Sequence, residues 1–372
     1  RMSKELFIGL MSGTSVDGVD CAIVSFEDNR VEVISTYFEE CPKELRENIL
    51  TICEGSRVSL KFLGETDIAV GKLFASVIKK QLKEKKINPK AIAAIGSHGQ
   101  TVWHQPSGNY PFTMQLGDPN VICQQTGITT VAGFRQKDVA NGGQGAPLAP
   151  LFHKEFFHRS DRDRAIINIG GIANITILPG KGVCSAYDIG PGNVLMDYWT
   201  LENQGSRYDK NGEWAATGQC DQELLEEMLE EPYLKKSPPK STGRELFNAV
   251  WLKNITSRYS RHLRIEDVQA TLSAFTSKCI ANAVNNLVKD SEVYICGGGV
   301  HNSYLMDGLK TSIKKSKVMT TSVLGIEPDW VEATTFAWLA KQSINHKKLE
   351  TAPFTGATKP CVLGGLYFSD LN

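Results

Sequence analysis

The first residues suited to chemistry lie in the segment MSGTSVDG, residues 11–18. Its glycines leave backbone N–H groups accessible and its hydroxyl side chains add donors, and together these suit phosphate oxygens. Asp17 could orient a magnesium ion through water, since Mg²⁺ keeps several of its waters in proteins. The alternative is a tight hairpin in which Asp17 and Gly18 only make the turn. Neither the lysine-containing phosphate loop nor the dinucleotide-binding glycine motif occurs in the chain.

Two further glycine turns follow apolar runs in the second half of the chain. Gly170 and Gly171 interrupt INIGGIAN (167–174), which is either a second phosphate-binding hairpin or an ordinary hairpin with a bulge. Gly298 and Gly299 belong to CGGGVHN (296–302). Three glycines after a strand let a flat group such as adenine approach the backbone closely. The alternative is a connector in which Asn302 caps a helix.

Three charged residues are candidates for catalysis or substrate binding. Asp188 is expected to end an apolar strand and open the glycine turn of DIGPGN (188–193), where it could accept a proton or simply cap a helix. Arg135 precedes the flexible segment NGGQG (141–145) and could bind a carboxylate or phosphate as a fork, or lie on a solvated loop. Glu332 opens an expected helix and is by default a partner of its dipole. His98 and His104 are more often structural than catalytic residues.

Hydrophobic periodicity places these residues on two similar sets of elements. In the first half we expect strands at 6–10, 21–24 and 31–38, a helix at 60–82, and a strand at 91–95 that ends in the turn 96–99. In the second half we expect strands at 165–169, 172–178 and 183–187, a helix at 266–289, a strand at 291–296 and a helix at 331–342. Residues 202–244 are expected to form an elaborated loop with one short helix at 224–229. The repeated plan indicates two α/β lobes facing a cleft.

The composition excludes several classes of protein. The chain has 372 residues, a length typical of two domains, and 41 basic residues balance 41 acidic ones. This balance argues against nucleic acid or an anionic membrane as partners, and no apolar run approaches the ~18 residues of a membrane helix. The nine cysteines are scattered, without the spacing of zinc ligands or a disulfide framework, which favours a reduced, cytoplasmic protein.

Several long sequence motifs, taken in their order along the chain, resemble those of a known family. They are GLMSGTSVDGVD (9–20), GSHGQTVWH (96–104), QLGDPN (115–120), RQKDVANGGQGAPLAP (135–150), INIGGIANIT (167–176), DIGPGN (188–193), KSTGREL (240–246), CGGGVHN (296–302) and VEATTFAWLA (331–340). With them the chain closely resembles the anhydro-N-acetylmuramic acid kinases, members of the acetate and sugar kinase, Hsp70 and actin superfamily.

The resemblance implies a fold and a set of site residues. The fold is α/β, with two RNase-H-like lobes of the actin and hexokinase type and an interlobe cleft. Lobe I would comprise 1–134 plus about 343–372 with the phosphate loop, and lobe II 135–342 with the catalytic aspartate and the adenine-binding glycines. Asp188 would be the catalytic base, and Arg135 and Glu332 would lie around the sugar, with Glu332 a second catalytic candidate. The nucleotide-binding residues would be Gly13, Thr14, Ser15, Val16, Asp17, Gly18, Val19, Asp20, Gly170, Gly171, Gly298 and Gly299.

The resemblance also implies a reaction. ATP and Mg²⁺ would serve an enzyme that opens the 1,6-anhydro ring of 1,6-anhydro-N-acetylmuramic acid with water and phosphorylates O6, in peptidoglycan recycling. A cytoplasmic homodimer is the family expectation. The alternatives are a levoglucosan-type anhydrosugar kinase, a kinase acting on a free sugar hydroxyl, and an Hsp70- or actin-like ATPase.

Overall fold

The chain divides into two compact units. The computed structural model describes residues 5–27, 29–55, 57–259, 261–287 and 290–370. Unit 1 consists of Arg1–Phe156 with Trp330–Asn372, and unit 2 of Phe157–Asp329. Arg135 and Glu332 therefore lie in unit 1, and Asp188 lies in unit 2. The functional domains expected from the sequence, with boundaries at 134 and 342, stay a prediction.

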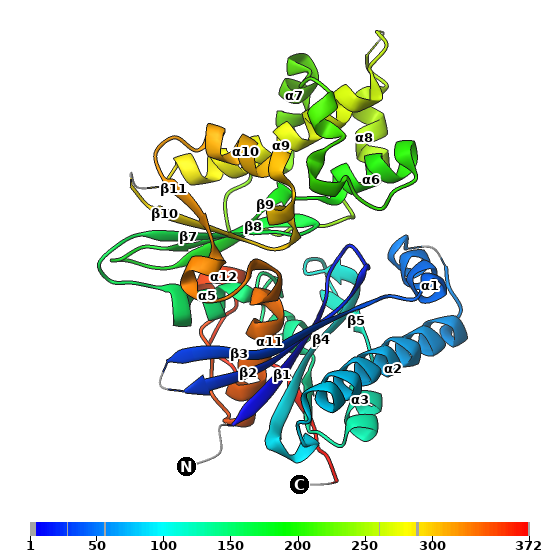
Figure 1. The fold of residues 1–372 in the computed structure, drawn as a ribbon, viewed down its shortest axis with the longest axis vertical. Helices are drawn as coiled ribbons and strands as arrows, with labels where there is room; N and C mark the ends of the chain where they lie inside the picture. Colours follow the sequence, from blue (N-terminus) through cyan, green and yellow to red (C-terminus); the bar gives the residue numbers. More distant parts are fainter. Residues whose placement is uncertain (1–4, 28, 56, 260, 288–289, 371–372) are drawn as a thin grey trace. The chain divides into compact units, whose positions relative to one another are not determined.

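Unit 1 contains a mixed sheet in the order β12-β6-β4-β1-β2-β3, with β5 paired to β4. Figure 1 labels the strands β1 to β5 of this sheet. The strands β1, β2 and β3 form antiparallel pairs, and β4 runs parallel to both β1 and β6. The bounds are β1 Leu6–Ser12, β2 Gly18–Glu27, β3 Arg30–Glu40, β4 Ile92–Gln105, β5 Phe112–Leu116, β6 Thr130–Ala132 and β12 Gly365–Tyr367.

Helices cover both faces of this sheet. Alternate residues of β1 point to opposite faces, so the strand contacts helices on both sides. Ile8 and Leu10 pack with apolar residues of α2 (Leu60–Lys85) in one core. On the other face, a Cβ atom at Gly9 would lie 1.7 Å from the carbonyl oxygen of Ala333 in α11 (Val331–Ile344). Glycine is therefore required where the α11 backbone lies against β1. The other helices of unit 1 are α1 Lys43–Cys53, α3 Pro119–Thr126, α4 Phe134–Ala140, α5 Ala149–Phe157, α12 Ala352–Thr355 and the 3₁₀ turn Pro89–Ala91.

Unit 2 contains a sheet in the order β11-β10-β7-β8-β9. The strands β7, β8 and β9 form antiparallel pairs, and β10 runs parallel to both β7 and β11. This repeats the order and directions of β1, β2, β3, β4 and β6 in unit 1. Each unit thus has the RNase-H-like arrangement, and the expected two-lobe α/β class is confirmed. The bounds are β7 Arg164–Ile169, β8 Ile172–Leu178, β9 Ser185–Pro191, β10 Glu292–Cys296 and β11 Lys317–Thr320.

The helices of unit 2 cover one face of its sheet. Leu272 and Phe275 of α9 share a core with Ile167 and Ile175 of the sheet. The helices are α6 Val194–Gln204, α7 Gln222–Leu229, α8 Ala249–Thr256, α9 Ile265–Asn285 and α10 Ser303–Ser312 (Figure 1). Short 3₁₀ helices lie at Lys210–Gly212, Ala215–Thr217, Pro232–Lys235, Gly298–His301 and Thr321–Leu324, and another, Pro328–Trp330, ends at the unit boundary.

The predicted C-terminal ends of two strands are wrong. The strand expected to stop before the turn 96–99 continues as β4 to Gln105, because Gly96, Ser97 and Gln100 pair with β1. Only Gly99, with φ of 80°, has the left-handed conformation typical of a turn residue in that stretch. The strand expected to end at Asp188 runs on to Pro191 as β9. The helix expected at 266–289 ends at Asn285, and residues 288–289 lie outside the described residues.

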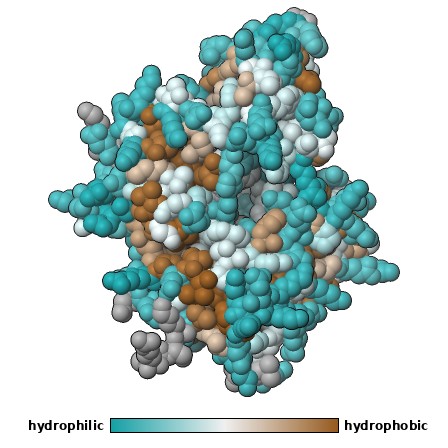
Figure 2. Space-filling view, viewed as in Figure 1, coloured by the Kyte–Doolittle hydropathy of each residue, from teal (hydrophilic) through white to brown (hydrophobic). Residues whose placement is uncertain are grey.

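The surface in view is mostly hydrophilic and is interrupted by apolar side chains (Figure 2). Exposed large apolar residues of unit 1 include Ile34 and Phe38 of β3 and Leu60 of α2. Across the described residues, none of the helices combines the length and the apolar character that crossing a membrane requires. All nine cysteines lie in the described residues, and none of them forms a disulfide bond there.

Candidate active site

The expected phosphate loop connects β1 to β2 in unit 1. Its N-terminal half forms a turn in which the Val16 N–H donates to the carbonyl oxygen of Gly13 over 3.2 Å. Val16 adopts a left-handed conformation with φ of 54°, which is rare for a β-branched residue. Its side chain is buried in the core between the sheet and α2, and this burial fixes the strained turn.

The two glycines of the loop have different roles. Among the described residues, no heavy atom would lie within 4 Å of a Cβ built on Gly13, so a ligand could approach the backbone there. A Cβ on Gly18 would lie 2.3 Å from the carbonyl oxygen of Glu39, so packing against β3 already requires that glycine. Asp17 is exposed, and its Oδ1 accepts a 2.8 Å hydrogen bond from the Ser15 hydroxyl.

Gln100 of β4 supports this loop and was not identified from the sequence. Its Nε2 donates to the Gly13 carbonyl oxygen over 3.2 Å, and its Oε1 accepts a 2.5 Å hydrogen bond from the Ser12 hydroxyl. The residue is buried, at 1% exposure. The parallel pairing of Ser12 with Gln100 brings the two together, and nothing in the local sequence predicts that register.

Arg135 is held in place at the start of α4. Its Nε donates to Nε2 of His98 over 2.8 Å, and its Nη1 donates to the Gly145 carbonyl oxygen over 2.9 Å. The N–H of Gly145 in turn donates to the buried Asp138 carboxylate over 2.8 Å. The guanidinium is therefore oriented by β4 and by the glycine-rich segment, as binding of a planar anion requires.

His98 supports Arg135 in its neutral form. Its Nδ1 lies 2.7 Å from the Gly99 carbonyl oxygen, which can only accept, so Nδ1 carries the hydrogen and Nε2 receives the bond from Arg135. Burial, together with the charge of Arg135, lowers the pKa of His98 to about 3. The same two causes lower the pKa of His104 to about 4. Both histidines are thus neutral, and His98 accepts the hydrogen bond that orients the arginine.

Glu332 belongs to the same cluster in unit 1. It lies in the first turn of α11, the helix whose backbone packs against β1. Desolvation raises the pKa of its carboxyl group, and the positive charge of Arg135 partly opposes this effect. Unit 1 therefore brings Arg135, His98 and Glu332 together, and two of the three were expected to surround the sugar.

In unit 2 the candidate base lies in a row of polar residues across the sheet. Asp188 of β9 pairs with Asn174 of β8, Asn174 with Asn168 of β7, and Asn168 with Cys296 of β10. Directly paired residues of antiparallel strands point to the same face, so both asparagines accompany Asp188. Asp188 is buried, at 6% exposure, and its Oδ2 accepts a 3.0 Å hydrogen bond from the Thr242 N–H. Neither asparagine was predicted to be a site residue, although a hairpin that turns at Gly170 and Gly171 would have predicted the pairing of Asn168 with Asn174.

The two glycine turns expected to contact nucleotide are neighbours in unit 2. A Cβ on Gly299 would lie 2.3 Å from Cγ2 of Ile169, so this glycine is required by packing against the end of β7. Gly298 has no heavy atom of the described residues within 4 Å of such a Cβ, and at Gly170 the nearest is the Ile172 carbonyl oxygen at 3.7 Å. Gly170 and Gly298 are thus accessible positions, whereas Gly299 is not.

Among the described residues, no group of three or more His, Cys, Asp or Glu side chains could hold a metal ion. Mg²⁺ in phosphoryl-transfer enzymes is commonly bound by one or two carboxylates, waters and the substrate phosphates, so an all-protein cage is not required. The exposed Asp17 carboxylate, beside the open backbone at Gly13, fits such a water-mediated role.

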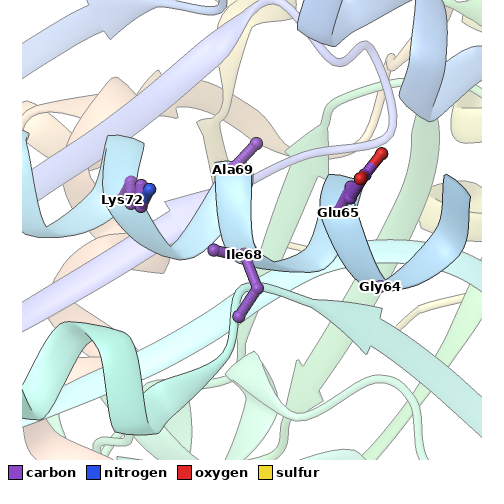
Figure 3. A pocket seen from close by; sticks show the side chains of 5 residues that line it. All are labelled: Gly64, Glu65, Ile68, Ala69 and Lys72. Atoms are coloured by element: carbon purple, nitrogen blue, oxygen red, sulfur yellow. The ribbon is translucent and has the colours of Figure 1, made fainter. Parts of the chain in front are cut away.

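A surface depression lies away from these residues, on helix α2. It has a volume of about 330 Å³ and is lined by Gly64, Glu65, Ile68, Ala69 and Lys72 (Figure 3). All five residues belong to one helix, and none is among the candidate site residues.

Two RNase-H-like units, one with a glycine turn between its first two strands and one with a buried aspartate on its sheet, define a protein of the two-lobe sugar-kinase and actin class. The model of the family described as anhydro-N-acetylmuramic acid kinase matches residues 5–369. The chain belongs to this family.

Curated relatives agree with this assignment. An anhydro-N-acetylmuramic acid kinase from Coxiella burnetii is 46% identical over 372 residues, covering 99% of each chain. One from Shewanella loihica is 45% identical and covers 98% of this chain and 99% of its own. Membership makes the chain a kinase, as expected, and supports ATP as its phosphoryl donor. The levoglucosan-kinase and actin-like alternatives are not favoured by these relatives.

Solved structures show weaker likeness. An activator of the 2-hydroxyisocaproyl-CoA dehydratase from Clostridium difficile has a TM-score of 0.46 and 13% identity, covering 91% of this chain and 97% of its own. A ROK family glucokinase from Streptomyces griseus has a TM-score of 0.41 and 13% identity, covering 91% and 99%. At these values the likeness carries no conclusion about function.

Proposed function

We propose that the enzyme hydrolyses and phosphorylates 1,6-anhydro-N-acetylmuramic acid in one coupled reaction. The 6-oxygen of this sugar is tied to C1, so no free 6-hydroxyl is available for an ordinary kinase reaction. Water adds to C1, the C1–O6 bond breaks, and O6 forms a bond to the γ-phosphorus of ATP as ADP leaves. The proton lost by water completes the balance, and the product is N-acetylmuramate 6-phosphate.

Asp188 is proposed as the general base that removes this proton. A base must be ionised at the working pH and held within reach of the proton that it removes. The hydrogen bond from the Thr242 N–H to Oδ2 favours the ionised carboxylate, because a donor stabilises negative charge. Because the Asp188 side chain is buried, bulk water has little access to its carboxylate.

Arg135 and Glu332 are proposed to bind the sugar. The lactyl group carries a carboxylate, and a guanidinium held at Nε and Nη1 presents the geometry that binds carboxylates. Glu332 has a raised pKa, so its carboxyl can retain a proton and donate a hydrogen bond to a sugar oxygen. In its ionised form, Glu332 would instead be the second candidate for the base.

The nucleotide is proposed to bind through backbone groups. Residues Gly13 to Asp20 and the turn at Gly170 and Gly171 would contact phosphates, and Gly298 and Gly299 would lie near adenine. Asp17 would hold a hydrated Mg²⁺, which neutralises phosphate charge when it is bound. The open backbone at Gly13 and Gly298 supports these roles.

Family membership over residues 5–369 is the observation that carries the proposal. The test is ATP turnover with the anhydro sugar, with levoglucosan, with N-acetylmuramic acid and without sugar, for wild type and Asp188→Asn. Turnover that requires the anhydro sugar and falls by roughly 10²–10⁴ in the variant supports the proposal. Sugar-independent turnover, or near-normal turnover by the variant, would contradict it.

We also propose a cytoplasmic homodimer that acts in peptidoglycan recycling. Light scattering of the purified enzyme measures the oligomeric state directly, and a monomer at micromolar concentration would contradict the dimer. Loss of growth on the anhydro sugar after gene deletion would support the metabolic role.

A further inference from the structure

The segment 233–242 holds Asp188 through its backbone as well as its side chain. The Tyr233 hydroxyl donates to the Asp188 carbonyl oxygen over 2.7 Å, and the Asp188 N–H donates to the Lys240 carbonyl oxygen over 3.2 Å. The Thr242 N–H adds the bond to carboxylate Oδ2 at 3.0 Å. Three contacts thus connect one residue of β9 to a segment that starts more than 40 positions later, within the region expected to be an elaborated loop.

The ammonium group of Lys240 is fixed next to the same residues. Its Nζ donates to the carbonyl oxygens of Tyr233 and Leu234 over 3.2 and 3.3 Å. It also lies over the Tyr233 ring at 4.7 Å and the Tyr187 ring at 5.5 Å from the centroids. Lysine is a flexible side chain whose ordering costs conformational entropy, so four simultaneous contacts indicate a defined position.

The charges of Lys240 and Asp188 interact. Desolvation lowers the pKa of Lys240, and Cys279 and, to a smaller extent, the Asp188 carboxylate act in the opposite direction. An interaction between two charges is reciprocal, so the lysine favours the ionised form of the aspartate by the same electrostatic energy.

The other titratable groups facing this pair are Tyr187, Tyr233, Lys236, Glu245 and Cys279. Burial raises the pKa of both tyrosines, and it raises the pKa of Cys279 to about 12, so these three groups are uncharged near neutral pH. Lys236 also lies over the Tyr233 ring, with its Nζ 5.8 Å from the ring centroid. Lys236 is exposed, so solvent screens the effect of its charge. Glu245 is the remaining acidic group, and burial raises its pKa.

We propose that the Thr242 N–H and Lys240 are positioning groups for Asp188: the Thr242 N–H orients its carboxylate, and Lys240, whose backbone carbonyl accepts from the Asp188 N–H, supplies a positive charge that keeps the carboxylate ionised as a base. The inference rests on the role proposed above for Asp188. This inference assigns a role to the motif KSTGREL (240–246), which belongs neither to the phosphate loop nor to the residues proposed to bind the sugar. Lys240 acts through Asp188 and contacts neither the sugar nor ATP in this account.

A pH profile separates this role from a purely structural one. In Lys240→Met the pKa of Asp188 should rise, so the acid limb of kcat/KM for the sugar should move to higher pH by about 0.5 unit or more. Lys240→Arg retains the charge and should restore most of the wild-type profile. Lys236→Met is the matched control, because it removes an exposed lysine over the same ring, and its acid limb should stay within about 0.2 unit of wild type.

A direct titration provides a readout that does not require turnover. Carbon-13 NMR of enzyme labelled at the aspartate carboxyl carbon identifies the Asp188 signal by its loss in Asp188→Asn. Its titration midpoint should rise in Lys240→Met. Replacing the Thr242 backbone N–H by an ester oxygen should raise it too, since that donor is lost while the side chain is kept.

The outcomes distinguish this inference from the proposed function. An unshifted midpoint and an unshifted acid limb in Lys240→Met, with a native circular dichroism spectrum, would overturn the inference even if Asp188→Asn is inactive. A shifted midpoint would support the coupling. If Asp188→Asn then proved fully active, the assignment of the base would fail while the coupling stood.

Discussion

Arg135 donates a hydrogen bond of 2.8 Å from Nε to Nε2 of His98, and this bond requires the histidine to be neutral. The Gly99 carbonyl oxygen at Nδ1 fixes the tautomer, and burial with the arginine's own charge lowers the pKa of His98 to about 3. A histidine next to a substrate-binding residue is often assumed to titrate near neutral pH. Here it serves as a permanent acceptor that orients a guanidinium.

Removal of that acceptor should weaken binding of the sugar. In His98→Leu we expect KM for the anhydro sugar to rise about tenfold, which corresponds to ~1.4 kcal/mol, because the guanidinium loses one of its two described anchors. KM for ATP should be unchanged. Wild-type KM for the sugar should also show no titration step near pH 6.5. Steady-state kinetics from pH 5.5 to 8.5 measure both, and a step near 6.5 that disappears in His98→Leu would show that this histidine titrates.

The contact between β1 and α11 should tolerate no side chain at Gly9. A Cβ there would lie 1.7 Å from the Ala333 carbonyl oxygen, so Gly9→Ala should destabilise the protein by about 3 kcal/mol and displace the helix that carries Glu332. Gly64→Ala is the control. Gly64 lies in α2 with no described heavy atom within 4 Å of its Cβ position, and the change should stabilise by ~0.5–1 kcal/mol. Urea unfolding of the two variants should give opposite signs, and equal stabilities would contradict the close approach of α11.

Gly13 should respond in the opposite way to Gly9. Space is open at its Cβ position, so Gly13→Val should fold normally. If nucleotide phosphates contact the loop backbone, the added side chain should reduce ATP affinity by at least about tenfold. Isothermal titration with a non-hydrolysable ATP analogue, together with circular dichroism, makes the measurement. Normal affinity would favour the alternative that residues 11–18 are only a hairpin.

The free energy of unfolding should fall as the pH drops from 6.5 to about 4. The pKa values of His98, His104 and His153 are lowered from 6.5 to about 3, 4 and 3 by burial. In this window the unfolded chain binds protons that the folded chain does not, so acid favours unfolding. The raised pKa of Glu332 acts in the opposite direction, since the folded state then keeps a proton that the unfolded state releases.

Asp67 and Glu245, whose pKa values burial also raises, act in the same direction as Glu332. The three histidines should dominate, because burial lowers their pKa values from 6.5 to about 3 or 4 and so keeps them neutral throughout the range from pH 7.5 to 5. Urea unfolding at pH 7.5, 6 and 5 should give a steadily decreasing free energy, and calorimetry in two buffers should detect proton uptake on unfolding at pH 5. Stability that is unchanged or higher at pH 5 than at pH 7.5 would contradict the buried neutral state of these residues.

The sequence predicted the parts of the fold that depend on local pattern. Period-two and helical periodicities located β1 to β3, α2, β7, β8 and α9, and the repeated plan indicated two similar lobes. The error at Gly96–Gly99 has a physical cause, because polar and glycine residues are typical of a turn unless a neighbouring strand and helix pack against them. Here β1 and α11 do so, and a Cβ at Gly96 would lie 1.9 Å from the Phe336 carbonyl oxygen.

The site was predicted less completely than the fold. Motifs and the family resemblance made Asp188, Arg135 and Glu332 candidates, and their roles in the site stay predictions. The groups that hold Asp188 and Arg135 come from distant parts of the chain. His98 lies 37 positions from Arg135, and Thr242 lies 54 positions from Asp188. Such pairs are brought together by strand register and loop paths that depend on tertiary packing, and one sequence alone contains no direct signal for them.

In the proposed reaction, water opens the anhydro ring and the released O6 is phosphorylated. The most direct measurement is one reaction in ¹⁸O-water with the anhydro sugar and ATP, followed by mass spectrometry and ¹³C and ³¹P NMR of the product. We expect one labelled oxygen at C1 of N-acetylmuramate 6-phosphate, and an unlabelled oxygen between C6 and phosphorus. Label found only in free phosphate, or phosphorylation of N-acetylmuramic acid with no conversion of the anhydro sugar, would contradict it.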